Sequence, residues 1–138
     1  MDWEYNYITI NELDEEVYGF VYKITNMITG RFYIGKKNAR FKRTLPPLRG
    51  KKRKRITYVE SDWRDYYGSN AELNRDVLAY GPQFFRREIL HFASASGELS
   101  YLELREQMRY LVLERDDCYN GIIQVKIHKK HINGKKSS

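Results

Sequence analysis

The sequence has one cysteine, Cys118, among its 138 residues. No disulfide can therefore form within the chain, which favours a reducing compartment and predicts a cytoplasmic protein. The first residues are acidic and lack the basic and apolar regions of a secretory signal peptide. No apolar run approaches membrane-spanning length, so we expect no membrane partner.

The residue patterns of several common catalytic and metal sites are also missing. Cys118 and the three histidines do not have the spacing of zinc ligands. The sequence contains no glycine-rich nucleotide-binding loop, and no serine or cysteine triad can be argued from it. The chemistry of the chain is therefore to be sought in its hydroxyl, carboxylate and basic side chains.

Basic residues are plentiful. The chain has 25 Lys and Arg against 18 Asp and Glu, which gives a formal net charge of +7. A basic domain of this size favours an anionic partner, and nucleic acid is the most common one. Its length and its 41% hydrophobic residues predict a single domain with a modest core.

The hydrophobic pattern predicts strand, strand, helix, strand and helix in that order. The first two strands flank Thr29-Gly30, which is a short turn signal. Ser69 or Asn70 caps the first helix, and Gly81-Pro82 ends it. This order predicts an α+β domain with a small central antiparallel sheet flanked by helices. The expected strands are 19–26, 31–37 and 83–92, and the expected helices are 70–80 and 98–115.

The chain divides into three parts: an acidic arm (1–17, with a short strand near 5–10), a domain (18–125, closed by a short strand in 122–127) and a basic tail (126–138). The domain carries a basic insertion at 36–60. Residues 36–55 hold eleven Lys or Arg and no acid.

Pro46-Pro47 and Gly50 lie within this insertion and interrupt regular structure. We expect a mobile loop whose cations contact phosphates without selecting sequence. The alternative is a solvated charge run without a partner. The expected nucleic-acid-binding residues are Lys36, Lys37, Lys51, Lys52, Arg53, Lys54, Arg55 and Arg64.

Val21-Tyr22 and Tyr33-Ile34-Gly35 resemble the two signature elements of the GIY-YIG nuclease family. The similarity covers about 18–123 and is greatest to phage-encoded, free-standing homing endonucleases, whose setting is the host cytoplasm. The resemblance implies a metal-dependent endonuclease that hydrolyses phosphodiester bonds of double-stranded DNA with Mg²⁺ or Mn²⁺. Further matching motifs are Tyr67-Gly68-Ser69, Leu73, Tyr80-Gly81, Glu88-Ile89-Leu90 and Tyr119-Asn120.

Tyr22 and Tyr33 match the two signature tyrosines, and the resemblance makes Tyr22 the candidate that positions or deprotonates the attacking water. A phenol with a pKa of about 10 needs a nearby cation to act as a base at neutral pH. Lys23, Lys36 and Lys37 are close in sequence. The alternative for both tyrosines is ordinary packing of strand aromatics.

Two further residues close the motif. Gly35 marks a place where the backbone approaches another group, such as a phosphate, or else a bulge or strand end. Asn120 can hydrogen-bond a phosphate or fix a neighbouring group. Its alternative is the Asn120-Gly121 turn that ends the second helix.

The resemblance also implies a catalytic arginine about ten residues after the second tyrosine, on a short helix. Arg43 has this spacing, and Arg40 lies about one turn earlier. Pro46-Pro47 and the basic insertion follow at once, which departs from the family pattern. Lys36, Lys37 or Arg64 are the alternatives for this role.

The implied metal ligand is a glutamate of the second helix, and Glu103 and Glu106 are both candidates. Glu106 falls on an apolar stripe, and its spacing to Asn120 favours it. The Tyr101-Leu102-Glu103 setting resembles the homing-type members more closely and favours Glu103. We expect one of the two to bind metal and the other to be an exposed helix glutamate.

Two other functions compete with catalysis. The first is a non-catalytic nucleic-acid-binding module that retains the nuclease fold, and the second is a small basic protein of ribonucleoprotein assembly. A complete set of Tyr22, Tyr33, Asn120 and a helix glutamate favours the enzyme. One such set per chain cuts one strand at a time, so a double-strand break needs two events or two protomers.

Overall fold

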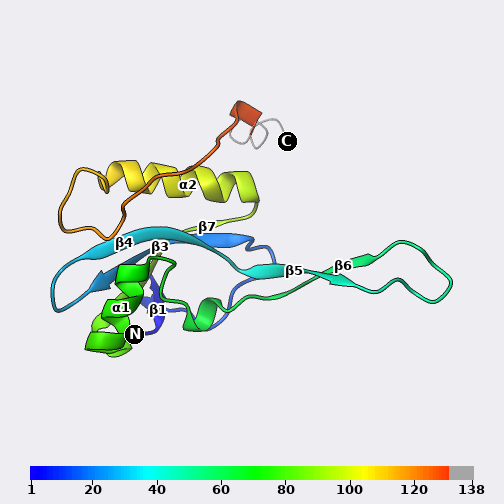
Figure 1. The fold of residues 1–138 in the computed structure, drawn as a ribbon, viewed down its shortest axis with the longest axis horizontal. Helices are drawn as coiled ribbons and strands as arrows, with labels where there is room; N and C mark the ends of the chain where they lie inside the picture. Colours follow the sequence, from blue (N-terminus) through cyan, green and yellow to red (C-terminus); the bar gives the residue numbers. More distant parts are fainter. Residues whose placement is uncertain (131–138) are drawn as a thin grey trace.

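A five-stranded sheet separates two layers of helix in the computed structural model, which describes residues 1–130 (Figure 1). The strands are β1 (Trp3–Tyr5), β2 (Ile8–Thr9), β3 (Gly19–Asn26), β4 (Phe32–Asn38), β5 (Arg40–Leu45), β6 (Arg55–Glu60) and β7 (Phe85–Ala93). The helices are α1 (Ala71–Tyr80) and α2 (Ser96–Arg109), with short 3-10 turns η1 (Trp63–Asp65) and η2 (Pro82–Phe84). Residues 131–138, the end of the predicted tail, lie outside the described residues.

The strand order in the sheet is β2-β1-β7-β3-β4. β3 is antiparallel to both of its neighbours, β4 and β7, as the sequence predicts. β1 pairs parallel with β7, so the sheet is mixed rather than wholly antiparallel. The predicted α+β class is confirmed, and neither described helix has the length and apolar character needed to cross a bilayer.

Side chains of β3 alternate between two cores. Phe20, Tyr22 and Ile24 pack on the face that α1 and η1 cover. Val21 points to the opposite face and packs with Leu99 of α2. Because all of these β3 side chains have 0% exposure, β3 is an inner strand on which both helical layers pack.

The second helix is shorter than predicted, and its end has a defined cause. α2 stops at Arg109, and Leu111 takes a left-handed φ of 52°. The Leu111 N–H donates to the Met108 carbonyl, and the Val112 N–H donates to the Gln107 carbonyl. This is a Schellman-type ending without glycine, and it turns Val112 into the core beside Leu99. The short strand that the sequence predicted in 122–127 does not form.

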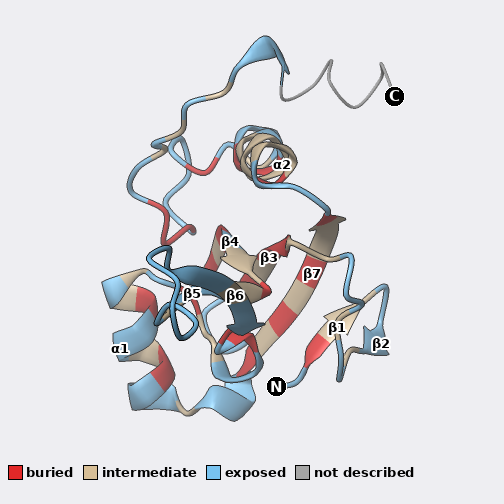
Figure 2. Cartoon of the chain, turned by 90° about the vertical axis from the view of Figure 1, so that its right-hand side faces the viewer, coloured by how far each residue is buried: buried red, intermediate tan, exposed pale blue. Residues whose placement is uncertain are grey.

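The basic insertion is a β-hairpin and not the mobile loop that we expected. β5 and β6 pair in antiparallel register from Arg40 with Glu60 to Leu45 with Arg55. Alternating β-branched and aromatic residues favour this extended pairing, although the charge run suggested disorder. The hairpin projects from the sheet as a two-stranded ribbon (Figure 1), and most of its residues are exposed (Figure 2).

Arg87 ties the N-terminal arm and η1 to the sheet. Its side chain is buried under the ring of Trp3, and the guanidinium carbon lies 4.8 Å from that ring's centroid. Its Nε donates to the Met1 carbonyl at 2.7 Å, and its Nη1 donates to the carbonyls of Arg64 and Tyr66 at 2.9 Å each. One planar donor group therefore satisfies three backbone acceptors from two distant segments.

We expect Arg87→Met to lower the free energy of unfolding by about 3 kcal/mol, because three carbonyls lose a charged donor in a buried place. Arg87→Lys should recover only part of this loss, since an ammonium cannot reproduce the planar fork. Arg75→Met on the exposed side of α1 is the matched control. Urea unfolding measures all three, and equal stabilities for Arg87→Met and Arg75→Met would contradict the assignment.

Candidate active site

Tyr22 and Tyr33 lie on the same face of neighbouring strands. In the register of β3 and β4, Tyr22 is opposite Gly35 and Ile24 is opposite Tyr33. The two tyrosine rings are therefore diagonal neighbours, with centroids 6.1 Å apart. The hairpin predicted from the sequence thus brings both signature tyrosines together.

Gly35 is required by the Tyr22 side chain. A Cβ at position 35 would lie 2.5 Å from the Tyr22 Oη and 2.8 Å from the Tyr33 Cε1. A Cβ at Gly68 would lie 3.5 Å from the same hydroxyl, and Gly68 has a positive φ of 91°. The close approach predicted at Gly35 is therefore to a tyrosine, and two glycines form a slot for its hydroxyl.

The Tyr22 hydroxyl is buried, and no described residue makes a hydrogen bond of normal geometry with it, although the side chain of Tyr66 is a polar neighbour that interacts with it. Burial raises its pKa well above the ordinary value, and the neighbouring Tyr66 and Tyr33 raise it further. The cation that we expected to lower this pKa is not supplied by Lys23, whose Nζ lies over the Phe32 ring on the other side of the sheet. In the protein without bound DNA, Tyr22 therefore carries a neutral hydroxyl and not a phenolate.

Tyr33 is more accessible than Tyr22. Its hydroxyl lies 3.2 Å from the Ser69 Oγ, so these two groups share a hydrogen bond. Burial raises the pKa of Tyr33, and the bond with Ser69 opposes this shift. Ser69 is free for this contact because Asn70 is the cap of α1 and accepts from the Leu73 N–H at 2.9 Å.

Glu103 is the helix carboxylate whose charge acts on the two tyrosines. Burial raises its pKa, while the positive charge of Lys36 and a hydrogen bond from the Lys36 backbone lower it. The negative charge of Glu103 in turn raises the pKa of both Tyr22 and Tyr33. Glu103 therefore lies close to the β4 edge beside Gly35, although α2 covers the opposite face of the sheet.

Glu106 has a different environment. It is 2% exposed, and its Oε1 lies 2.8 Å from the His91 Nε2 and 3.8 Å from the Arg109 Nη1. We expected one of the two glutamates to be an exposed surface residue, and this was wrong, because Glu103 is half-buried and Glu106 is buried. A buried carboxylate is retained here because it is paired with a ring nitrogen.

Asn120 binds backbone in the free protein. Its Nδ2 donates to the Ile34 carbonyl at 2.8 Å, and its Oδ1 accepts from the Ile34 N–H at 3.0 Å. The Gln107 Nε2 donates to the same carbonyl at 3.1 Å. Of the two roles considered for Asn120, the geometry matches fixation of a neighbour, and that neighbour directly precedes Gly35.

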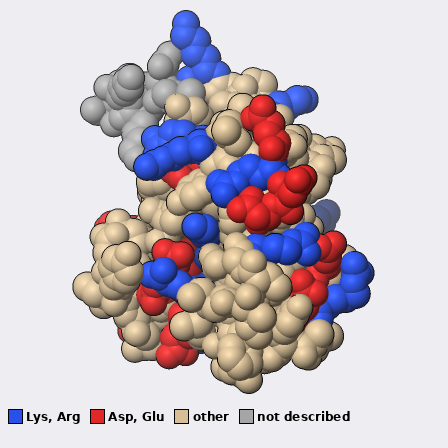
Figure 3. All heavy atoms as spheres, turned by 90° about the vertical axis from the view of Figure 1, so that its left-hand side faces the viewer, with Lys and Arg blue, Asp and Glu red and all other residues tan. Residues whose placement is uncertain are grey.

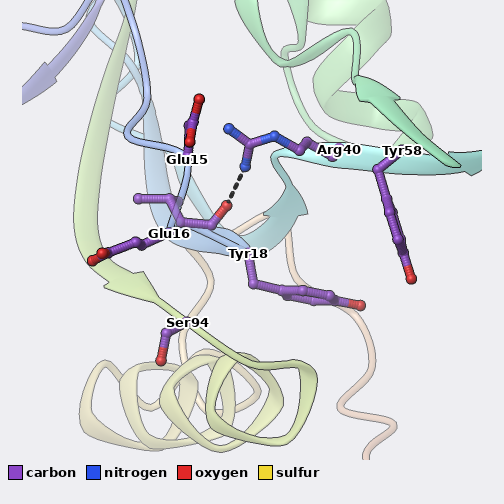
Figure 4. A pocket seen from close by; sticks show the side chains of 7 residues that line it. Glu15, Glu16, Tyr18, Arg40, Tyr58 and Ser94 are labelled. Atoms are coloured by element: carbon purple, nitrogen blue, oxygen red, sulfur yellow. Dashed lines mark hydrogen bonds between the residues drawn. The ribbon is translucent and has the colours of Figure 1, made fainter.

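The predicted arginines lie away from the tyrosines. The Arg40 Nη1 donates to the Val17 carbonyl at 2.8 Å, which holds the acidic arm (Figure 4). Arg43 is in β5 and not on the short helix that we expected. The Arg64 Nε pairs with Glu60 at 3.0 Å and lies over the Trp63 ring.

Of the two lysines after Gly35, Lys37 contacts the tyrosine cluster of Tyr22, Tyr33 and Tyr66, and Lys36 points to the α2 face of the sheet. The Lys37 Nζ lies 4.0 Å from the centroid of the Tyr66 ring, which itself packs edge-on to Tyr22. It also lies 2.6 Å from Asp62 and holds the pKa of that carboxyl below its usual range. The Lys36 Nζ donates to the Ser100 Oγ at 2.9 Å. Of the remaining predicted cations, Arg55 opens β6, and Lys51, Lys52, Arg53 and Lys54 lie in the connection before it.

The sequence reasoning did not identify Ser69 and Ser100 as polar groups of this site. Ser69 was singled out only as a helix cap and as part of Tyr67-Gly68-Ser69, and that motif was the available signal. Nothing in the sequence distinguished Ser100. No group of three His, Cys, Asp or Glu side chains within residues 1–130 has the arrangement of a metal site.

Comparison with known proteins accounts for this arrangement. Residues 3–123 match the family described as "Putative endonuclease segE, GIY-YIG domain". The chain belongs to the GIY-YIG family. It is also 30% identical over 103 residues to "Putative endonuclease segD" of Enterobacteria phage T4. That match covers 75% of this chain and 37% of the phage T4 protein, and no solved structure shows significant similarity.

The family resemblance read from the sequence is therefore confirmed, and the GIY-YIG hairpin is β3–β4. In this GIY-YIG domain, the two tyrosines meet around Gly35 on β4, an edge strand of the sheet, and the charge of Glu103 raises the pKa of both. The positions that we predicted as catalytic arginines do not join them.

Tyr22→Phe should leave the free energy of unfolding unchanged or raise it by up to about 1 kcal/mol, because the variant removes a buried hydroxyl that makes no hydrogen bond of normal geometry. Tyr119→Phe is the matched control. The Tyr119 Oη donates to Asp76 at 2.6 Å and accepts from the Asn26 Nδ2 at 3.2 Å. Its removal should cost about 1–3 kcal/mol. Thermal or urea unfolding compares the two, and a large loss in Tyr22→Phe would show that its hydroxyl has a structural partner.

Proposed function

We propose that this GIY-YIG domain hydrolyses phosphodiester bonds of double-stranded DNA. The observation that carries the proposal is the packing of Tyr22 and Tyr33 around Gly35 on β4, with ring centroids 6.1 Å apart. The charge of Glu103 acts on both tyrosines, and the Lys37 ammonium lies over the neighbouring Tyr66 ring. A carboxylate, hydroxyls and a lysine in one region suit the charge changes of phosphate chemistry. The phage T4 relative supports a phage setting, so we propose a free-standing, homing-type enzyme acting in the host cytoplasm.

Hydrolysis requires a water oxygen to bond to phosphorus while one bridging P–O bond breaks. The water loses a proton, and the departing oxygen gains one. Because burial raises the pKa of Tyr22, we assign its neutral hydroxyl to donate a hydrogen bond to the water or to a phosphate oxygen, and not to act as a phenolate base. Tyr33 and Ser69 offer a second pair of hydroxyls at the same place.

Glu103 is the residue that would hold Mg²⁺ or Mn²⁺. A single carboxylate fits such an ion, because Mg²⁺ usually keeps several waters and is completed by substrate phosphates. Glu106 does not fit, since His91 already occupies its Oε1. The ion would supply a positive charge that polarises a phosphate oxygen and stabilises the charge that develops on it.

Lys36 and Lys37 take over the arginine's electrostatic role in this proposal. Both are in β4 directly after Gly35, and their ammonium groups lie beside α2 and beside Tyr66 respectively. A lysine provides a point charge without the bidentate fork of arginine. It can therefore balance the charge of a phosphate but orients it less strictly.

We expect the protein to nick or linearise supercoiled plasmid DNA with Mg²⁺ or Mn²⁺ and to leave it intact in excess chelator. We expect this because the candidate metal ligands near Glu103 are oxygen atoms, which favour a hard divalent ion. Agarose gels at matched protein concentration measure the conversion. Full cleavage in chelator would rule out the metal, and protection of DNA without cleavage under any divalent ion would favour the non-catalytic binding module instead.

Glu103→Gln should reduce cleavage by at least about a hundredfold while DNA binding in chelator persists, because the variant removes the carboxylate and leaves the basic surface intact. Glu114→Gln, on the exposed segment after α2, is the control and should cleave normally. Glu106→Gln should instead lower stability by about 1–3 kcal/mol, because it removes the pairing of a carboxylate with His91. Normal cleavage by Glu103→Gln would show that the metal site is elsewhere.

A further inference from the structure

The β5–β6 ribbon has the dimensions of a groove-binding element. Six paired residues per strand give it a length of about 20 Å. A two-stranded ribbon fits the major groove of B-form DNA, which is about 12 Å wide. The ribbon leaves the sheet beyond β4, and no other described segment covers its outer part (Figures 1 and 2).

The cross-strand register divides the ribbon into two faces, because directly opposed residues point to the same side. One face, here called the site-side face, contains Phe41, Arg43, Leu45, Arg55, Thr57 and Val59. The other, here called the arm-side face, contains Arg40, Lys42, Thr44, Ile56, Tyr58 and Glu60. The neighbours Lys42 and Arg43 therefore present one cation each to opposite sides.

The site-side face continues into the tyrosine cluster. The Lys37 Nζ lies 5.0 Å from the centroid of the Phe41 ring and 4.0 Å from that of Tyr66. The Tyr66 ring packs on Tyr22 with centroids 5.8 Å apart. Phe41 is thus linked through Lys37 and Tyr66 to the Tyr22 ring, so DNA held at Tyr22 and Tyr33 would extend along the site-side face.

The arm-side face meets acidic residues. Tyr58 and Arg40 line a hollow together with Glu15 and Glu16 of the N-terminal arm (Figure 4). A second hollow at the ribbon base is lined by Arg40, Glu60 and Glu12. These carboxylates repel phosphate, and the Arg40 guanidinium is already bound to the Val17 carbonyl. Electrostatics therefore favours approach of DNA to one face of the ribbon only.

The chemistry of the site-side face suits base edges as well as phosphates. Arg43 is exposed at the middle of the strand and opposite Thr57. An arginine can bind guanine through two parallel hydrogen bonds, and threonine contacts several bases. By contrast, the end of the molecule opposite the ribbon shows Lys and Arg interspersed with Asp and Glu (Figure 3).

We propose that the β5–β6 ribbon enters the major groove next to the scissile bond and selects sequence through Arg43 on the site-side face. The tip cations Lys51, Lys52, Arg53 and Lys54 then contact phosphates flanking the groove. This inference rests on the proposed function, because it places DNA at the tyrosine cluster. It differs from the expectation of a loop that adds affinity without selecting sequence.

The test measures binding in chelator, where no cleavage is needed. A pool of random-sequence duplexes is incubated with the protein, bound molecules are recovered, and their sequences are read. Wild type should enrich a short motif. Arg43→Gln should weaken binding to that motif by about tenfold or more, the value of one bidentate base contact. Lys42→Gln, with the same charge change on the arm-side face, should lose less than about threefold and keep the motif.

Two further variants separate base contacts from charge. Arg43→Lys keeps the charge but loses the fork, so it should retain most of the non-specific affinity and lose part of the motif. Replacing Lys51, Lys52, Arg53 and Lys54, which lie in the connection between the two strands, by Gln should weaken binding to all sequences alike. It should lower the log–log salt slope by about 0.9 for each phosphate that the tip no longer neutralises, and it should leave the motif unchanged.

Equal effects of Arg43→Gln and Lys42→Gln, or no enriched motif for wild type, would overturn the groove-reading ribbon. Loss of the motif in the tip variant would place selection at the tip and would also overturn it. Each outcome is distinguishable from failure of the proposed function. If the ribbon variants alter which sequences are bound but the protein never cuts plasmid DNA, only the proposed nuclease activity is refuted. If the ribbon variants bind and cut DNA like wild type, only the proposed role of the ribbon is refuted.

Discussion

The site depends on the backbone N–H groups of β4 that point away from the rest of the sheet. As an edge strand, β4 presents alternate N–H groups that no further strand pairs. The Phe32 N–H donates to the Asp117 carbonyl, and the Ile34 N–H donates to the Asn120 side chain. The next group in this row is the Lys36 N–H, whose interaction with Glu103 lowers the pKa of that carboxyl and places it beside the edge strand. The proposed metal ligand thus lies near the strand that also holds Gly35.

The position of the Tyr22 side chain also depends on β4. The absence of a side chain at Gly35 lets the ring of Tyr22 lie against β4, and Asn120 clamps the residue before that glycine. Burial of the hydroxyl then has two effects: it fixes its position, and it disfavours the charged phenolate. A rigid neutral donor results, which is better suited to orienting a water or phosphate than to removing a proton.

The sequence predicted the elements with strong local signals and missed those decided by long-range contacts. β3, β4, β7 and α1 follow from strand periodicity, a turn and a cap. The end of α2 could not be predicted from such signals, because Leu111 adopts its left-handed φ so that Val112 can enter the core. Glu103 and Glu106 could not be distinguished from the sequence because their different partners, Lys36 of β4 and His91 of β7, are brought to them by the fold. The ribbon was missed because its charge suggested disorder, whereas the pairing of β5 with β6 determines its form.

The ribbon has a fixed position relative to the site because the chain that joins them is short. β4 ends at Asn38 and β5 begins at Arg40, so only Ala39 separates the two strands. Ala39 is buried, its N–H donates to the Tyr18 carbonyl, and its carbonyl accepts from the Ser61 N–H at the end of the ribbon. Both strands of the ribbon are thus anchored at one point on the strand that holds Gly35 and Lys36. A duplex bound along the ribbon would therefore reach the tyrosine cluster at a fixed register, and base selection at Arg43 would determine which phosphodiester lies beside Glu103.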